Sequence, residues 1–333
     1  IYIYAIIKTE DPRFFLKECD RLNLKNTIEV KNPLSASGKY KYFKRRLKIF
    51  LFGFQLRKHN PDIIIPYLNP PSIVANLCYR ISGAKHTFWH HRGQDYFRKD
   101  AIEKLSVKRT KLFIANSPNG LKELRKEFRL SKDETFFLPN FSTLKNTDVL
   151  EKKKNKGSII IGMVAHFRDN KEHYLLVDAF QHLKKKYSNI SLVLVGNVYE
   201  PLGHQKVIDL IEEHQLQDSV KIIHDTQAKE ILPTIYIGVL ISKVEGMPNV
   251  IMEYMAHKLA VVSSKHEGCQ FLLGENYEYL VDNEVESITD KLDRLLKNKE
   301  YLEKIGEQNH QRLNENFSIE KYTNSLTSIL ENV

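Results

Sequence analysis

Two carboxylates eight positions apart, Glu245 and Glu253, bracket the segment Glu245-Gly-Met-Pro-Asn-Val-Ile-Met-Glu253. If the whole span were helical, a rise of about 1.5 Å per residue would separate them by roughly 12 Å. The two carboxyls of a glycosidase lie roughly 5 to 9.5 Å apart, so a hydrolytic acid and nucleophile pair is disfavoured. We interpret them as two acceptors at opposite ends of one elongated polyhydroxyl ligand. The alternative is one loop charge and one solvated helix residue.

The neighbouring residues predict the elements that position this pair. The apolar, β-branched run Thr234–Ser242 is typical of an interior strand of a parallel sheet, and Ala260–Ser264 predicts the next strand. Between them we expect a tight turn at Gly246 and a helix that begins at Pro248. The turn would then lie at the carboxyl edge of the sheet, where the free N–H groups of a helix start bind anions such as a diphosphate.

This segment resembles the Glu-x7-Glu signature of the family 4 glycosyltransferases, and other segments resemble that family in the same order along the chain. They are Ile114–Ser117, Leu138–Asn140, Ser158–Ala165, His166–Lys171 and Leu192–Gly196. The resemblance covers roughly residues 60 to 330. It implies an α/β protein of the GT-B fold, with two Rossmann-like, doubly wound domains facing a central cleft. It also implies retaining transfer of a hexose from a UDP- or GDP-linked sugar.

The resemblance assigns roles to individual residues. Lys171 matches a lysine that binds the donor phosphates, whereas His166 stands where the family usually has arginine, so Arg168 is expected to take over that contact or diphosphate binding to depend on pH. In Trp89–Asp95, His91 is expected to touch the donor sugar; His90, Arg92 and Asp95 are candidates for the acceptor, and a structural role for the cluster stays open. The catalytic set is Glu245, Lys171, Arg168 and His91; the donor-binding set is Glu253, Gly246, Met247, Pro248, Asn249 and His166.

The family resemblance also implies how the reaction proceeds. In the front-face mechanism no side chain acts as nucleophile, and the protein stabilises charge that builds on the leaving diphosphate. We find no Asp-x-Asp sequence, so neither a metal site nor a cofactor is expected.

Length and alternation of patterns predict the organisation of the chain. A chain of 333 residues exceeds what one core usually organises. Strand and helix patterns alternate in both halves, and the charged run within 145–157 interrupts them. In the first half they include a helix near 13–22 and a strand over 63–67. We predict an acceptor-binding domain over 1–150, a nucleotide-sugar domain over 151–315, and a C-terminal helix over 316–333 that crosses back to the first domain. Ile1–Ile7 predicts a strand, but the N-terminal strand and the Gly-rich loop expected of the family are not evident before that strand, so a leading segment is expected to be missing from this chain.

Charge is divided unevenly between the halves. Residues 1–150 carry 29 Lys and Arg against 14 Asp and Glu, a net of +15, whereas residues 151–333 carry 22 against 27, a net of −5. The segment Lys39–Lys58 interleaves cations with aromatic residues, which is typical of a helix lying on an anionic membrane. The alternative is that its apolar residues are simply core: Leu47, Phe50, Leu51 and Phe54.

Other features narrow the class of protein. Three cysteines without a CxxC pattern, no long apolar run and no signal peptide predict a cytoplasmic protein, at most peripheral to the inner face of a membrane. No nucleic-acid-binding signature is present. We expect a glycosyltransferase that acts on a glycan or lipid-linked acceptor in cell-surface polysaccharide synthesis. The alternative is a non-catalytic GT-B scaffold that binds a sugar nucleotide or a partner protein.

Overall fold

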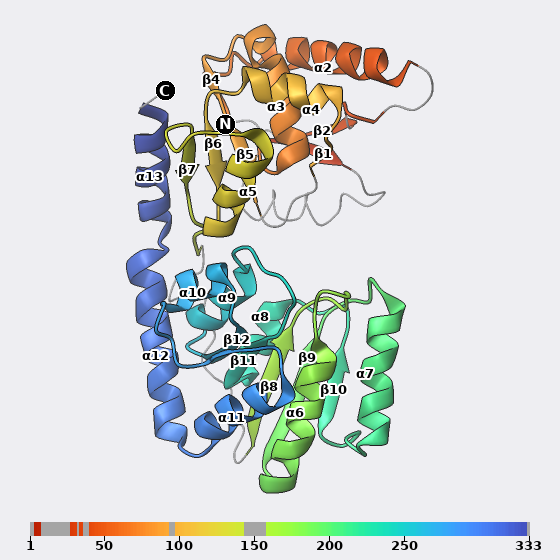
Figure 1. Ribbon diagram of the computed structural model, residues 1–333, viewed down its shortest axis with the longest axis vertical. Coiled ribbons are helices and arrows are strands. Elements are labelled where there is room, and N and C mark those ends of the chain that lie inside the picture. The colour runs from red at the N-terminus through yellow and green to blue at the C-terminus, as the bar shows by residue number, and fades with distance from the viewer. Residues whose placement is uncertain are drawn as a thin grey trace. The chain divides into compact units, whose positions relative to one another are not determined.

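The protein was analysed as a computed structural model, which describes residues 3–7, 27–31, 33–35, 40–92, 97–142 and 158–331. The chain divides into two compact units (Figure 1). The first unit comprises residues 1–116, 120–137 and 329–333, and the second comprises residues 117–119 and 138–328. The predicted boundary at residue 150 and the charged run around it lie outside the described residues.

The first unit pairs its strands in parallel throughout the described residues. Strand β1 (Ile3–Ile7) pairs with β2 (Thr27–Lys31), β3 (Ile63–Ile64) with β4 (His86–Thr87), and β6 (Phe113–Ala115) with both β5 (Trp89–His91) and β7 (Thr135–Phe137). Its helices are α2 (Lys41–Arg57), α3 (Asn69–Ser82), α4 (Ala101–Arg109) and α5 (Pro118–Phe128). The alternation is confirmed, although the strand predicted over 63–67 ends at Ile64 and the sequence did not predict β7 or α4. The helix predicted over 13–22 lies outside the described residues.

Helix α2 lies against α3 through one narrow stripe. Ile49, Phe52, Gly53 and Leu56 are its buried residues. A Cβ on Gly53 would come within 2.9 Å of the Ile81 side chain, so glycine permits the close approach of the two helices. The four residues that the core alternative placed inside, Leu47, Phe50, Leu51 and Phe54, are exposed. That alternative is therefore wrong for this stripe, because the helix turns a different apolar stripe inward.

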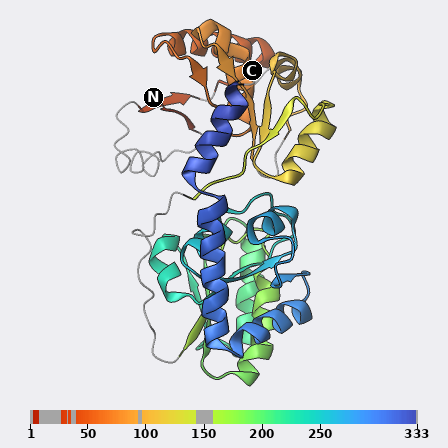
Figure 2. The same cartoon turned by 90° about the vertical axis from the view of Figure 1, so that its left-hand side faces the viewer.

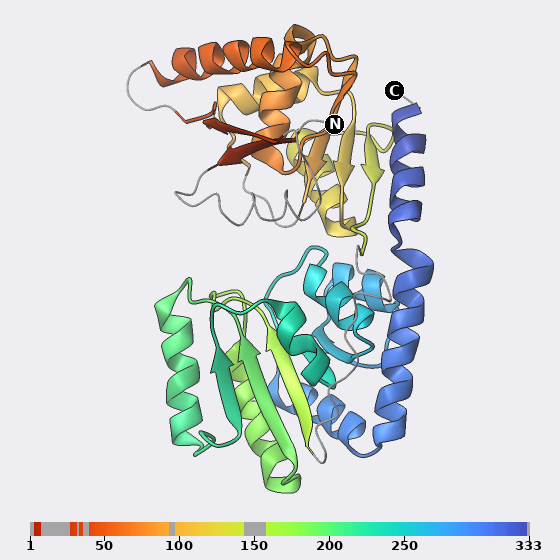
Figure 3. The ribbon, with the colours of Figure 1, turned by 180° about the vertical axis from the view of Figure 1, so that it is seen from behind.

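The second unit contains a six-stranded parallel sheet in the order β10-β9-β8-β11-β12-β13. The strands are β8 (Ile159–Val164), β9 (Ile190–Val195), β10 (Val220–Ile223), β11 (Ile237–Leu240), β12 (Ala260–Ser264) and β13 (Leu280–Val281). From β8 the chain proceeds to β9 on one side, whereas β11 occupies the other side. The strand order thus reverses next to β8, and ligands of doubly wound sheets bind at such a switch point. Figure 3 shows β8, β9 and β10 side by side.

Helices cover the sheet of the second unit. Their bounds are α6 (His173–Lys186), α7 (Pro201–Glu213), α8 (Ala228–Ile231), a 3-10 turn η1 (Leu232–Thr234), α9 (Asn249–Ala256), α10 (Glu267–Leu273), α11 (Val285–Leu296), α12 (Lys299–Asn316) and α13 (Ile319–Glu331). Helix α6 packs against α7 and α11, whereas α9 packs against α10 and α12. The long helix α12 runs beside the sheet (Figure 2). A doubly wound α/β unit is therefore confirmed here.

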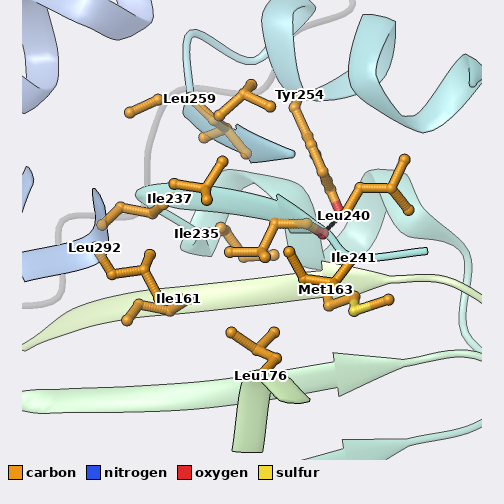
Figure 4. Packing of buried hydrophobic residues seen from close by; sticks show 14 of the residues in the cluster. Ile161, Met163, Leu176, Ile235, Ile237, Leu240, Ile241, Tyr254, Leu259 and Leu292 are labelled. Atoms are coloured by element: carbon orange, nitrogen blue, oxygen red, sulfur yellow. Dashed lines mark hydrogen bonds between the residues drawn. The ribbon is translucent and has the colours of Figure 1, made fainter. Parts of the chain in front are cut away.

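The core of the second unit fixes helix α9 to the sheet. Tyr254 on α9 is fully buried among aliphatic side chains from the strands (Figure 4). Its hydroxyl donates to the Val239 carbonyl at 3.1 Å and accepts from the Val164 backbone N–H at 2.8 Å. A Cβ on Gly238 would come within 2.5 Å of the Tyr254 ring, so only glycine leaves room for it. Helix α9 is thus anchored next to β8 and β11 through Tyr254.

Candidate functional site

Lys171 and Glu245 form an ion pair at the switch point of the six-stranded sheet in the second unit. Lys171 Nζ contacts Glu245 Oε1, and the two side chains are 17% and 10% exposed. Lys171 follows β8 and Glu245 follows β11, and these strands are neighbours. The carboxyl ends of parallel strands meet at one edge, which is why residues 74 positions apart come together. The structure thus brings together two residues that the sequence assigned to one site.

Backbone hydrogen bonds hold the two loops against each other. Lys171 and Ser242 form an isolated antiparallel bridge, the Lys243 N–H donates to the Asn170 carbonyl at 2.9 Å, and the Glu172 N–H donates to the Ile241 carbonyl at 3.0 Å. The loop after β8 therefore cannot move independently of the loop after β11.

A buried carboxylate reinforces this contact. Glu172 accepts hydrogen bonds from Asn283 Nδ2 at 2.5 Å and from the Tyr174 hydroxyl at 2.9 Å. Asn283 Nδ2 also donates to the Ser242 carbonyl at 2.8 Å. Buried polar groups with all partners in place tend to rigidify their surroundings. Glu172 and Asn283 thereby hold the backbone that carries Lys171.

The turn from Gly246 to Asn249 leads directly into helix α9. Pro248 is the residue before the helix, which begins at Asn249, one position later than predicted. Gly268 packs directly against this turn, because a Cβ at that position would lie 1.4 Å from the Gly246 carbonyl oxygen. A side chain at residue 268 is therefore incompatible with the observed turn.

Asn140 holds the same turn from a distant part of the sequence. Its Nδ2 donates to the Asn249 side-chain oxygen at 2.8 Å and to the Met247 carbonyl at 3.3 Å. Asn140 is buried. The Leu138–Asn140 segment, which the sequence assigned to the end of the first domain, thus contributes to the support of α9 in the second unit.

Glu253 presents a carboxylate with no protein partner among the residues that the structure describes. It lies on α9, is half-buried, and burial raises the pKa of its carboxyl above the ordinary range. Keeping a partly desolvated acceptor unpaired costs free energy. Hydroxyl groups of a ligand would remove that cost, which fits the role predicted for Glu253.

His166 and Arg168 lie in the loop after β8 but make different contacts. His166 Nδ1 accepts from the Asn197 backbone N–H at 3.1 Å, so the proton of the neutral ring resides on Nε2. Burial, and then the charge of Arg168, lower the pKa of His166. At neutral pH His166 therefore offers a neutral N–H donor. The Arg168 guanidinium stacks over the Tyr199 ring, 4.4 Å from its centroid.

The cluster in the first unit is built into its core. His91 is fully buried, stacks on Phe97, and has Nδ1 3.3 Å from Asn69 Oδ1 and Nε2 3.3 Å from Glu123 Oε2. His90 is also buried, and desolvation lowers its pKa to about 3.

The other two candidates of this cluster are placed differently. Arg92 lies over the Tyr67 ring, 5.3 Å from its centroid, whereas Asp95 falls outside the described residues. The roles assigned to this cluster stay predictions.

The second unit therefore concentrates most of the predicted site in one place. Lys171, Glu245 and residues 246–249 lie along one sheet edge, and Glu253 follows one turn of helix later. Sequence reasoning missed Asn140, Gly268, Glu172 and Asn283, which hold these residues without carrying recognisable chemistry. Only the Leu138–Asn140 motif gave a signal, and it did not indicate what Asn140 contacts.

The arrangement can bind an elongated anion with hydroxyl groups at both ends. A lysine and the free N–H groups at the start of α9 suit phosphates, and two carboxylates suit hydroxyls. Among the residues described, no group of three or more His, Cys, Asp or Glu is placed to hold a metal ion. No helix in the described ranges has the length and apolar character needed to span a bilayer.

Known proteins with similar sequences are sugar transferases. The chain is 24% identical over 237 residues to the capsular polysaccharide biosynthesis glycosyltransferase CapH of Staphylococcus aureus, covering 66% of the chain and 64% of CapH. It is 25% identical over 301 residues to the N-acetylgalactosamine-N,N'-diacetylbacillosaminyl-diphospho-undecaprenol 4-alpha-N-acetylgalactosaminyltransferase of Campylobacter jejuni, covering 85% of the chain and 79% of that protein. The chain spans less than two thirds of CapH and 62% of an uncharacterized glycosyltransferase of Methanocaldococcus jannaschii.

Solved structures of the same fold include HepE of Anabaena in complex with UDP and glucose. The TM-score is 0.79 at 14% identity, over 100% of this chain and 92% of that one. The GT-B fold predicted from the sequence is thereby confirmed. The sequence model of the family described as "Glycosyl transferases group 1" matches residues 144–312, just over half of the chain. This protein therefore belongs to the group 1 glycosyl transferases.

Proposed function

We propose that the protein is a retaining glycosyltransferase that moves a hexose from a nucleotide sugar to a glycan or lipid-linked acceptor in cell-surface polysaccharide synthesis. The observation that carries the proposal is the Lys171–Glu245 pair beside the start of α9, with Glu253 on the same helix, whose carboxylate has no partner among the described residues. The names of CapH and of the Campylobacter transferase support the acceptor class.

The pairing of Lys171 with Glu245 suits a site that waits for an anion. An ion pair this well buried carries a desolvation cost that its own attraction only partly offsets. A donor diphosphate would give Lys171 a stronger partner and leave the Glu245 carboxylate for sugar hydroxyls. Glu253 would accept hydrogen bonds from the ribose hydroxyls at the other end of the donor.

The proposed reaction breaks the bond between the anomeric carbon and the phosphate oxygen. The acceptor hydroxyl attacks from the side on which the nucleotide leaves, a new glycosidic bond forms, and the hydroxyl proton passes to the leaving phosphate. Lys171, Arg168 and the N–H groups of residues 247–249 would stabilise the charge that develops on the diphosphate. This step needs neither a protein nucleophile nor a metal ion, so we propose a metal-independent reaction.

UDP-linked sugars are the first donors to test, because the HepE structures hold UDP, glucose or UDP-glucose. GDP-linked sugars remain the second choice. His166 is proposed to donate from Nε2 to the diphosphate, and His91 to contact the donor sugar.

A binding panel and a turnover assay test the donor site. We expect UDP-glucose or a related donor to raise the melting temperature, because ligand at 100 times its dissociation constant adds about 2.7 kcal/mol to the free energy of unfolding. We then expect nucleotide release with acceptor in the presence of a chelator, and the product to keep the anomeric configuration of the donor. Wild-type activity in Glu253→Ala would contradict the site assignment.

We also propose that the protein acts at the inner face of a membrane through α2. Phe43, Leu47, Phe50, Leu51 and Phe54 recur at intervals of three and four residues and are all exposed. Lys41–Lys58 contains seven Lys and Arg, counted from the sequence at positions 41, 44, 45, 46, 48, 57 and 58, and no Asp or Glu. An apolar stripe bordered by cations suits an anionic lipid surface.

Flotation with vesicles tests this association. We expect binding to vesicles containing phosphatidylglycerol that weakens as salt rises, and little binding to neutral vesicles. Leu51→Glu should abolish it while leaving the thermal shift with UDP-glucose unchanged. Equal binding to neutral and anionic vesicles would contradict the role of the cations.

A further inference from the structure

The first unit contains an apolar groove formed by α2, α3 and α4. Its volume is about 400 Å³, within the range of roughly 300 to 1,000 Å³ of small-molecule sites. Leu47 and Phe50 of α2, Leu77 and Ile81 of α3, and Leu105 of α4 are among its lining side chains. Leu47 and Phe50 belong to the exposed stripe of α2, so the groove is continuous with that surface.

Cations border the groove. Arg46 and Arg109 are its charged lining residues. Both are exposed, and neither forms an ion pair with any residue that the structure describes. Arg109 also lines a second, smaller hollow together with Tyr79, Lys85, His86, Thr87 and Lys111. The apolar groove and a cationic hollow therefore meet at Arg109.

The cationic hollow is open to an anion. Lys85 contacts Asp62 at 3.5 Å, but both side chains are largely exposed, so this contact holds the lysine weakly. Lys111 and Arg109 make no ion pair within the described part of the chain. Three cations around one small hollow suit a phosphate group.

We propose that these two hollows bind one phosphate-bearing phospholipid of the membrane, with a hydrocarbon chain in the apolar groove and its phosphate at Arg109, Lys85 and Lys111. The inference rests on the proposed membrane association and goes beyond it, because a surface helix needs no site for an individual lipid. Charge complementarity and the continuity of the groove with the exposed stripe of α2 select a membrane lipid over a free metabolite.

A series of soluble alkyl phosphates tests the site without vesicles. Calorimetric titration with hexyl, octyl and decyl phosphate should give dissociation constants that fall about four-fold for each added methylene. Decyl phosphate should bind far more tightly than inorganic phosphate or decanol. An affinity that does not depend on the length of the alkyl chain would contradict the placement of that chain in the apolar groove.

Matched variants locate the site. Leu47→Ser should weaken decyl phosphate binding about five-fold, whereas Leu51→Ser on the same stripe, which does not line the groove, should change it less than about two-fold. Arg109→Gln should weaken it about ten-fold, and Lys108→Gln beside it should have no effect. Equal losses in Leu47→Ser and Leu51→Ser would sink the assignment.

Further measurements distinguish the lipid site from general membrane association, from an acceptor site and from the donor site. Vesicle binding without decyl phosphate binding would overturn the lipid site and leave membrane association standing. Geranyl phosphate has as many carbons as decyl phosphate, so a clear preference for it would assign the groove to an isoprenoid acceptor and overturn the phospholipid. The UDP-glucose thermal shift should be the same in all four variants, so its loss would report on the donor site alone.

Discussion

The carboxyl edge of the six-stranded sheet and the exposed face of α2 both suit anionic ligands, but their cations are held in opposite ways. At the sheet edge, Lys171 is largely buried and already paired with Glu245. On α2, most of the cations and a stripe of apolar side chains are exposed. A buried, paired cation favours one ligand in one geometry, whereas exposed cations favour any surface of opposite charge.

The largest effect should come from removing the buried cation. Lys171→Met should lower kcat/KM by about 10² to 10³, because the diphosphate loses its charged donor in the transition state. Lys243→Met removes an exposed lysine from the facing loop and should leave kcat/KM unchanged. Since the variant leaves Glu245 unpaired, melting temperatures must show that it is folded. Equal kcat/KM in both variants would erase the distinction between the two cations.

Next in size is the effect of crowding the turn before α9. Gly268→Ala forces the Gly246 carbonyl to move, and overpacking of this kind costs about 1 to 3 kcal/mol. Donor affinity should fall by about ten-fold, measured by titration with UDP-glucose. Gly203→Ala is the control, because the nearest atom to its added Cβ is 3.8 Å away. Unchanged affinity in Gly268→Ala would show that the turn need not keep this shape.

Removing a single exposed cation of α2 should have a smaller effect, and that effect should be on vesicle binding. Lys44→Gln on α2 should weaken binding to anionic vesicles about five-fold, since one lysine near such a surface contributes about 1 kcal/mol. Lys132→Gln, an exposed lysine outside α2, should not change it. Neither variant should alter donor binding. If Lys132→Gln had the same effect, net charge and not α2 would govern the association.

Glu253→Gln should stabilise the protein without ligand. Burial raises the pKa of Glu253, so its ionised form destabilises the folded state increasingly as pH rises above about 4.5 and through the raised pKa. The variant should therefore melt higher than the wild type at pH 7.5 and match it near pH 4. Each 1 kcal/mol of added stability raises the melting temperature by about 2–4 °C for a domain of this size. It should also bind UDP-glucose more weakly. A variant that is less stable at pH 7.5 would indicate a structural role for Glu253.

The smallest effect concerns His166. Its pKa is lowered in the free protein, and a bound diphosphate favours the protonated ring. UDP-glucose affinity should thus rise a few-fold as pH falls from 8 to below the ordinary histidine pKa of about 6.5. His166→Gln should remove this dependence. UDP-glucose is the better probe, because the terminal phosphate of UDP itself titrates near pH 6.

The sequence was sufficient to predict the long, regular parts of the fold. The apolar runs of β8, β9 and β11 and the Glu245–Glu253 segment follow patterns that are local in sequence. Short elements such as β7 and β13 were missed, because two or three residues contain no measurable periodicity. The alternative that placed Leu47, Phe50, Leu51 and Phe54 in the core is wrong, because α2 has two apolar stripes and only the position of α3 decides which one is buried.

The candidate site was predictable where chemistry is carried by residue type. Lys171 and Glu245 were both identified, although their direct contact depends on β8 and β11 being neighbours. Asn140, Gly268 and Asn283 were not identified, because their importance lies in distances to backbone atoms far along the chain. Tertiary contacts of this kind leave no trace in a single sequence.

The hydrogen bonds of Asn140 decide how the second unit should be produced in isolation. The region matched by the family begins at residue 144, after Asn140, and ends at residue 312. A fragment cut at those limits would lose the amide that holds Met247 and Asn249, and also the bond from the Ser142 N–H to the Phe317 carbonyl at 2.9 Å. An expression fragment spanning 138–328 keeps both sets of hydrogen bonds. It is therefore the fragment on which donor binding should be measured in the absence of the first unit.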